Sequence, residues 1–76
     1  MKELVEVIAR SLVNHPEDVV VTETVDENGE VVLTLSVAED DMGKVIGRQG
    51  RIAKAIRSVV KAAASREEKH VTLDIQ

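Results

Sequence analysis

The chain of 76 residues contains no cysteine, phenylalanine, tyrosine or tryptophan. Without cysteine it has neither disulfide bonds nor thiolate ligands for a metal ion. Without aromatic residues its core must be aliphatic, and it lacks the rings on which RRM domains and OB folds stack single-stranded bases. The composition therefore excludes a disulfide-stapled protein and argues against these two nucleic-acid-binding folds.

The sequence also lacks a long apolar segment. Glu3 and Glu6 interrupt the first apolar stretch, and no small-residue cleavage site follows it, so the N-terminus is not typical of a signal peptide. Hydrophobic residues make up 43% and charged residues 32%, a balance typical of a folded protein in solution. We expect one small domain over residues 1–76, no association with a membrane, and a cytoplasmic location.

Residues suited to catalysis are equally scarce. The only two histidines, His15 and His70, fall in different predicted elements, and neither has a nearby nucleophile or a carboxylate pair placed to match a catalytic role. The acidic run at residues 39–41 lacks further metal ligands, and the glycine spacing matches neither the dinucleotide-binding nor the P-loop pattern. We therefore expect no enzymatic activity, no cofactor and no metal.

The net charge of −4 conceals a strong segregation of charge along the chain. Residues 1–41 sum to −9, residues 42–66 carry seven basic and no acidic side chains, and residues 67–76 sum to −2. Because screening acts over about 8 to 10 Å at physiological salt, a local basic patch can bind a polyanion despite distant acids.

Hydrophobic spacing predicts three elements in the first half of the chain. Apolar residues recur at helical intervals over residues 1–12, and Pro16 ends that pattern. Two segments rich in β-branched residues follow, at 19–25 and 31–37, and Asn28-Gly29 between them is a strong hairpin signal. We predict one amphipathic helix and two antiparallel strands.

Two loop lengths are compatible with this hairpin. A two-residue loop would pair Thr24 with Leu33, whereas a three-residue loop with a left-handed Gly29 would pair Val25 with Val31. We favour the three-residue loop, which also pairs Val21 with Leu35 and Val19 with Val37.

The second half predicts two helices and a strand. Residues 39–41 are interpreted as the acidic start of a short helix to about Ile46, where their side chains complement the positive helix end and cap free amides. In the next helix, the predicted core face comprises Ile52, Ala55, Ile56, Val59 and Ala63, and the opposite, basic face Arg51, Lys54, Arg57 and Lys61. Alternating residues at 70–75 predict the last strand.

The resulting order is helix, strand, strand, helix, helix, strand. This order predicts an α+β fold in which a three-stranded sheet carries three helices on one face. A right-handed crossover through the two helices permits the second and third strands to run parallel.

Three of the four glycines lie in the segment MGKVIGRQGRI, together with three basic residues. Gly47-Arg48-Gln49-Gly50 is predicted to be a tight turn between two helices that requires unusual backbone angles. A turn needs only one glycine, however, and a glycine at each end also removes Cβ atoms from the surface. Free helix amides and the cations around the turn then suit a phosphate.

The stretch Val45-Ile46-Gly47-Arg48-Gln49-Gly50-Arg51-Ile52 closely resembles the signature of KH domains. In that family a G-x-x-G turn clamps the sugar-phosphate backbone of about four single-stranded nucleotides. The predicted element order resembles the type II KH arrangement, α-β-β-α-α-β, and the resemblance covers essentially the whole chain. It implies a non-enzymatic protein that binds single-stranded RNA.

More narrowly, the chain's length and its N-terminal helix resemble the small bacterial KhpA-like RNA-binding proteins. That resemblance implies an RNA chaperone or post-transcriptional regulator in the cytoplasm. It also implies a homodimer, or a heterocomplex with a second, larger KH-containing RNA-binding protein.

The resemblance assigns RNA contacts to ten residues in and around the turn: Gly43, Lys44, Ile46, Gly47, Arg48, Gln49, Gly50, Arg51, Ile52 and Lys54. The last strand, around residues 70–73, would form the other wall of the base groove. Ile46 and Ile52 are equally compatible with a purely structural role in the core. Arg57 and Lys61 are interpreted as a solvated helix face.

A rival hypothesis keeps the fold but assigns its main surface to protein binding, with RNA binding secondary. Valines outside the predicted core faces, such as Val7, Val13 and Val60, would supply that contact, although scattered exposed valines are also normal.

Overall fold

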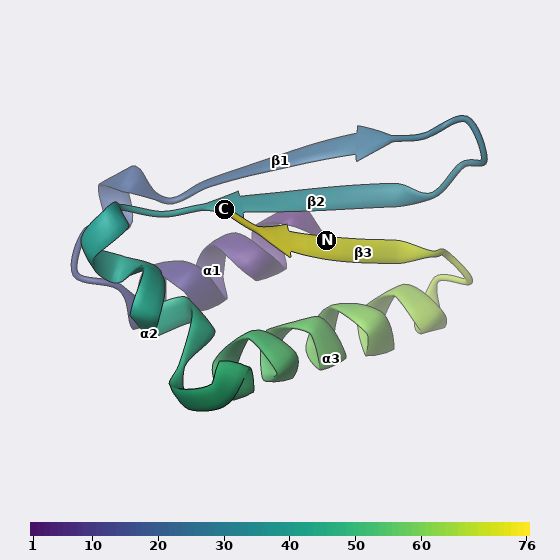
Figure 1. The fold of residues 1–76 in the computed structure, drawn as a ribbon. Helices are drawn as coiled ribbons and strands as arrows, with labels where there is room; N and C mark the ends of the chain where they lie inside the picture. The colour runs from purple at the N-terminus through teal and green to yellow at the C-terminus, as the bar shows by residue number, and fades with distance from the viewer.

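The computed structural model describes all residues from 1 to 76 and has the predicted order of elements (Figure 1). The helices and strands are α1 (Lys2–Leu12), β1 (Val20–Val25), β2 (Val31–Ser36), α2 (Met42–Ile46), α3 (Arg51–Arg66) and β3 (Val71–Ile75). Short 3-10 turns lie at Pro16–Asp18, Glu39–Asp41 and Arg48–Gly50. Helices α1 and α3 pack on the same face of the sheet, which confirms the predicted α+β architecture.

The hairpin between β1 and β2 has the predicted three-residue loop. Val25 pairs with Val31, and Gly29 adopts a left-handed conformation with φ of 81°. The amide of Asp26 donates to the carbonyl of Glu30 at 2.9 Å, which closes the loop. The Asp26 carboxylate accepts from the amides of Asn28 and Glu30, so loop chemistry sets the register.

The sheet has the order β1-β2-β3, with β2 antiparallel to β1 and parallel to β3. The parallel pair confirms the predicted crossover, because the chain leaves β2, passes through α2 and α3, and returns to β3 beside it (Figure 1). β3 is therefore an edge strand, and α3 runs along it.

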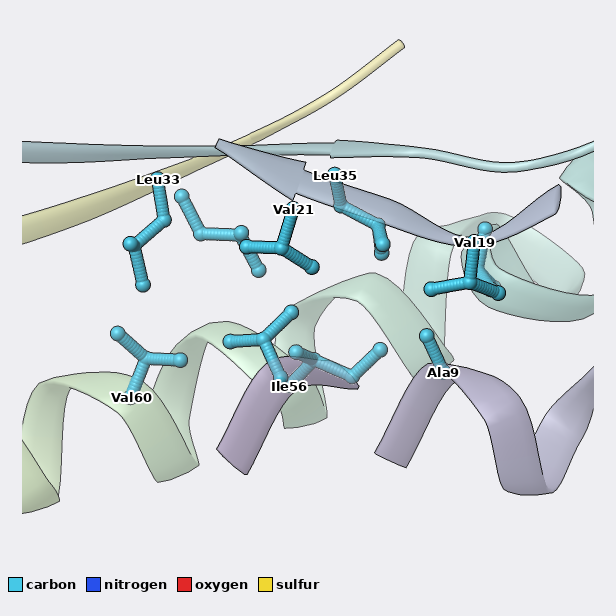
Figure 2. Close-up of a cluster of buried hydrophobic side chains, with 10 residues drawn as sticks. Ala9, Val19, Val21, Leu33, Leu35, Ile56 and Val60 are labelled. Atoms are coloured by element: carbon cyan, nitrogen blue, oxygen red, sulfur yellow. The ribbon is translucent and has the colours of Figure 1, made fainter. Parts of the chain in front are cut away.

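An aliphatic core fills the space between the sheet and the helices. Figure 2 shows Val21, Leu33 and Leu35 directed from the sheet toward Ile56 and Val60 of α3. The remaining core members are Val5 and Ala9 of α1, Val19, Val45 of α2, and Leu73 of β3. Branched aliphatic side chains thus replace the missing aromatics.

The predicted core face of α3 is rotated from the observed one. The buried residues are Ala53, Ile56, Val60 and Ala64. Ala55 is exposed, and Val59, which the periodicity places in the core, leaves 44% of its surface exposed. Val60, predicted to lie outside the core, is only 1% exposed. The apolar arc of α3 is wider than the area that the sheet covers, so helical periodicity alone does not determine which part is buried.

Asp41 also differs from its predicted role. The acidic run does begin the helical segment, but Asp41 makes no side-chain cap for α2. Its fully buried carboxylate instead accepts the backbone amides of Asn14, at 3.1 Å, and His15, at 2.9 Å. These hydrogen bonds of Asp41 therefore link the segment between α1 and β1 to the start of α2.

The environment of Asp41 favours its ionised form. Burial alone raises its pKa, but the two amide hydrogen bonds and the neighbouring Lys44 outweigh burial, so the pKa lies below its ordinary value. The buried carboxylate has hydrogen-bond partners for both oxygens, as a buried charge requires.

Candidate nucleic-acid interface

The turn between α2 and α3 has the unusual backbone that its glycines predicted. Gly47 has φ of 75° and ψ of 174°, Gly50 has φ of 74°, and Gln49 between them has φ of 58°. The Gly47 amide donates to the Gly43 carbonyl at 2.8 Å, and the Gly50 amide donates to the Gly47 carbonyl at 3.1 Å. Three positive φ values within four residues make the chain reverse sharply.

The two glycines of the turn have different reasons to lack a side chain. A Cβ atom on Gly47 would lie 2.6 Å from Cγ1 of Ile52, so the missing atom makes room for that side chain. A Cβ atom on Gly50 would meet nothing within 4 Å. The sequence predicts that both glycines keep the outer surface free of Cβ atoms. This prediction is right for Gly50 and wrong for Gly47, where the side chain of Ile52 occupies the space from inside the fold.

Four cations surround the turn, at Lys44, Arg48, Arg51 and Lys54, and all four are exposed. Of these only Lys44 has a carboxylate partner, since its Nζ lies 3.5 Å from Oδ1 of Asp41. The guanidinium of Arg51 donates to the neutral Oε1 of Gln49 at 3.4 Å. The turn thus carries three cations that no protein carboxylate neutralises.

The two isoleucines beside the turn occupy different environments. Ile46, at the end of α2, is 37% exposed, whereas Val45 beside it is fully buried. Ile52 is half-buried and packs against the core under Gly47. Of the two roles left open by the sequence, the surface position fits Ile46, and Ile52 supports the turn from below.

The outer edge of β3 is not paired with another strand and lies next to α3. The Val31 amide donates to His70, and the Gln76 amide donates to Leu35, so even-numbered residues of this segment bond to β2. In a parallel pair the alternate residues Val71, Leu73 and Ile75 then direct their backbone groups outward. This edge therefore offers backbone amides and carbonyls beside α3.

Arg57 joins α3 to this edge, a contact that sequence reasoning missed. Its Nε donates to the Leu73 carbonyl at 3.2 Å, so the side chain does more than solvate the helix. The available signal was its spacing, because Lys54, Arg57 and Lys61 recur on one side of a helix. Asp41 was missed for another reason, since its partners Asn14 and His15 are 27 and 26 residues away in the chain.

The ten residues assigned from sequence lie together on α2, on the turn and on the first turn of α3. Elsewhere, ligand atoms of His15, Glu17 and Asp18 lie within 4.8 Å of one another, but all three side chains are exposed. Such exposed acidic groups commonly gather without an ion. None of the helices is long and apolar enough to cross a membrane.

Comparison of the sequence with known proteins identifies the family of the chain. The family described as KhpA/KhpB, KH domain, matches residues 2–75. The chain belongs to this KH family. It is 63% identical to RNA-binding protein KhpA of Clostridium perfringens over 99% of both chains, and 57% identical to that of Clostridium acetobutylicum with the same coverage. It is 59% identical to KhpA of Halalkalibacterium halodurans, over 99% of this chain and 97% of the other.

No solved structure matches the chain at a significant level. The assignment to the KH family therefore depends on the sequence comparisons, and the arrangement of the turn comes from the geometry described above.

Proposed function

We propose that the protein is a non-enzymatic, single-stranded RNA-binding protein that holds the RNA backbone at the Gly47–Gly50 turn. The observation that carries the proposal is the bare backbone of Gly50 beside Arg48, Arg51 and Lys54, three cations without a carboxylate partner. The relatives that match the whole chain are named RNA-binding protein KhpA, which supports RNA as the polyanion.

The chemistry of each surface indicates which part of the RNA it contacts in this proposal. Arg48 and the backbone at Gly50 contact phosphates, where charge and the absence of a Cβ atom permit close approach. Ile46 contacts a base through its exposed aliphatic surface, and the outward backbone groups of β3 read base edges. Bases must be unstacked to enter this groove, so the protein binds single strands in preference to a regular duplex.

In the cell this activity would serve an RNA chaperone or a post-transcriptional regulator in the cytoplasm. Binding through backbone and aliphatic contacts suits such a role, because it tolerates many sequences. We assign the turn no reaction, in keeping with relatives that are named as RNA-binding proteins.

The test replaces the two non-glycine residues of the turn with aspartate, in the double variant R48D/Q49D, and leaves both glycines in place. Aspartate tolerates the positive φ of Gln49. We expect unchanged thermal unfolding and RNA affinity weaker by about tenfold or more, or about 1.4 kcal/mol. Fluorescence anisotropy with a short unstructured RNA measures the affinity.

The matched control is R10D/S11D, which makes the same change in charge at two exposed positions of α1. It should keep most of the affinity for RNA. For the wild type, log affinity should fall against log salt with a slope of roughly −1.5 to −3, as expected for two to four neutralised phosphates. If R48D/Q49D folds and binds RNA as the wild type does, the turn is not the RNA clamp.

A second proposal concerns assembly, because the outer side of α3 exposes an apolar surface. One hollow between α1 and α3 is lined by Ile8, Leu12, Arg51, Ile52, Ala55, Ile56 and Val59. A second hollow continues it along α3 and is lined by Val59, Ala62, Ala63, Arg66 and Glu67. We name this continuous surface the outer α3 face.

The outer α3 face is complementary to itself. Arg51 and Glu67 lie at its opposite ends, each eight residues from Val59. In an antiparallel pair of α3 helices centred on Val59, Arg51 of each copy would meet Glu67 of the other, and Ala55 would meet Ala63. Small residues permit close helix packing, and a two-fold axis makes both ion pairs at once. We therefore propose a homodimer.

Dimerisation also serves RNA binding. One KH groove holds about four nucleotides, which limits affinity and specificity, and a second linked groove raises the effective concentration of the strand. A larger KH-containing protein with a similar helix face is the competing partner, and the resulting heterocomplex is an alternative outcome of the test described in the Discussion.

A further inference from the structure

A cleft of about 550 Å³ lies at the end of α3 that is far from the Gly47–Gly50 turn. We name it the far cleft. Lys61 and Ser65 line it from α3, His70 and Thr72 from the start of β3, Glu30 from the hairpin and Glu68 from the loop after α3. Its volume is within the range of sites that hold small organic groups. None of its lining residues is among the ten that we assign to RNA contacts at the turn.

A row of basic side chains connects the turn with the far cleft. Lys54, Arg57 and Lys61 are spaced at three and four residues, so they share one side of α3. The bond from Arg57 to the Leu73 carbonyl shows that this side faces the edge of β3. With a rise of 1.5 Å per residue, the row spans about 10 Å of helix.

The cations of this row are available to a ligand. None of the four ion pairs in the structure includes Lys54, Arg57 or Lys61, and all three residues are exposed. An RNA backbone leaving the turn along α3 would therefore find one unneutralised cation at each turn of the helix, as far as the mouth of the cleft.

The inside of the far cleft has a different character. Glu30 and Glu68 line it together with Lys61 and Lys69, so the carboxylates would repel a phosphate placed deep inside. Carboxylates instead accept hydrogen bonds from the amino groups of bases, as acidic side chains do from N4 of cytosine. The hydroxyls of Ser65 and Thr72 add groups that both donate and accept.

Two small apolar residues complete the cleft. Ala64 is buried and Val71 is half-buried, and both form part of its wall. An apolar wall with a few polar groups around it suits the flat face and polar edge of a nucleobase.

We propose that the far cleft binds a nucleobase of the same RNA strand whose backbone lies on the Gly47–Gly50 turn, and that it prefers a base with an exocyclic amino group. The proposal rests on the RNA binding proposed above. Lys61 holds the phosphate of this nucleotide at the mouth, and Glu30 accepts from its amino group. The RNA footprint then exceeds the roughly four nucleotides of one KH groove.

The experiment compares a four-nucleotide RNA with the same RNA extended by four cytidines, or by four uridines, at either end. Amide chemical-shift titration of the wild type gives the affinity and the residues that respond. We expect cytidine extension at one end to tighten binding about fivefold over the short RNA and about threefold over uridine extension. Amides of residues 61, 70 and 72 should shift only with the longer RNA.

Two variants with matched controls identify the cleft. Lys61→Ala should bind the short RNA as the wild type does but should not bind the extended RNA more tightly. Lys2→Ala should bind both RNAs as the wild type does. Glu30→Gln should lose the preference for cytidine, whereas Glu27→Gln, on the same hairpin loop, should keep it. These four variants carry exposed substitutions, so they fold as the wild type does.

The two proposals fail in different ways. Binding of the short RNA without any gain from extension would overturn the far cleft and leave the RNA clamp in place. A gain from extension that Lys61→Ala and Lys2→Ala reduce equally would also overturn it, because the gain would then come from overall charge. Failure of the short RNA to bind at the turn would overturn the clamp itself.

Discussion

At the scale of single residues, Gly47 is constrained twice. Its ψ of 174° at φ of 75° is a conformation that side chains strongly disfavour, and Ile52 occupies the space where a Cβ atom would lie. Gly50 has a left-handed backbone with open space around it, so only its conformation disfavours a side chain.

This difference predicts unequal costs for the same substitution. We expect Gly47→Ala to lower the free energy of unfolding by about 2 to 4 kcal/mol, through backbone strain and overpacking together. Gly50→Ala should lower it by about 1 to 2 kcal/mol, from strain alone. Urea denaturation of both variants measures the costs, and equal values would contradict the role assigned to Ile52.

A second residue-scale prediction concerns Asp41 and pH. Its pKa is lower in the fold than the ordinary value of 3.8, so its ionised form stabilises the fold. That stabilisation is complete above about pH 4 and is lost as the pH falls through the lower, folded pKa. Asp41→Asn should therefore unfold at lower urea than the wild type at pH 7, and the difference should shrink below about pH 4.

Urea midpoints between pH 3 and 7 test this dependence. Asp40→Asn is the control, because Asp40 is exposed in the same acidic run. A difference between Asp41→Asn and the wild type that stays constant over this range would show that the charge of Asp41 contributes nothing.

At the scale of elements, α3 presents three different sides. Ala53, Ile56, Val60 and Ala64 face the sheet, Val59 lies in the outer α3 face, and Arg57 faces the edge of β3. One element thus supplies the core, the proposed RNA track and the proposed dimer surface.

Two neighbouring valines of α3 test which side is the core. Val60→Ala should lower the free energy of unfolding by about 2 kcal/mol, because it empties a buried position. Val59→Ala should change it by less than about 0.5 kcal/mol. Urea denaturation at low protein concentration keeps self-association out of the comparison. The reverse order of costs would restore the core face that the helical spacing predicted.

The elements that the sequence predicted well depend on local chemistry. Pro16, the Asn28-Gly29 pair, the β-branched residues of β1 and β2 and the alternation in β3 act within a few residues, and the structure has each element near its predicted place. The glycine turn was equally predictable because its residues are consecutive. Packing across the fold was not predictable in this way. Neither the contact of Ile52 with Gly47 nor the exposure of Val59 is indicated by neighbouring residues in the sequence.

At the scale of the whole molecule, the acidic hairpin loop is far from the basic turn. The hairpin loop, with Asp26, Glu27 and Glu30, lies at the opposite end of the molecule from the Gly47–Gly50 turn (Figure 1). The longest dimension is 34 Å, several times the screening length of about 8 to 10 Å at physiological salt. The acidic hairpin therefore does not prevent a polyanion from approaching the turn.

The proposed homodimer makes a prediction of its own at this scale. In the antiparallel α3 pair, R51E places like charges together at two symmetry-related contacts, and so does E67R. Each single variant should weaken dimerisation by about threefold to tenfold, because exposed ion pairs contribute about 0.2 to 1 kcal/mol each. The double variant R51E/E67R exchanges the charges and should recover the affinity of the wild type. Sedimentation equilibrium over a range of concentrations measures all four proteins.

Val59 supplies the decisive apolar test of the same interface. V59D would bring two carboxylates together on the two-fold axis, so this variant should be a monomer that melts as the wild-type monomer does, since Val59 is 44% exposed. A strict monomer for the wild type at high concentration would contradict the homodimer. If cell extract then supplies a KH-containing partner that binds the wild type and not V59D, the outer α3 face serves a heterocomplex. Dimerisation that persists in V59D and fails to respond to the charge exchange would place the interface elsewhere, because no antiparallel α3 pair could tolerate both changes.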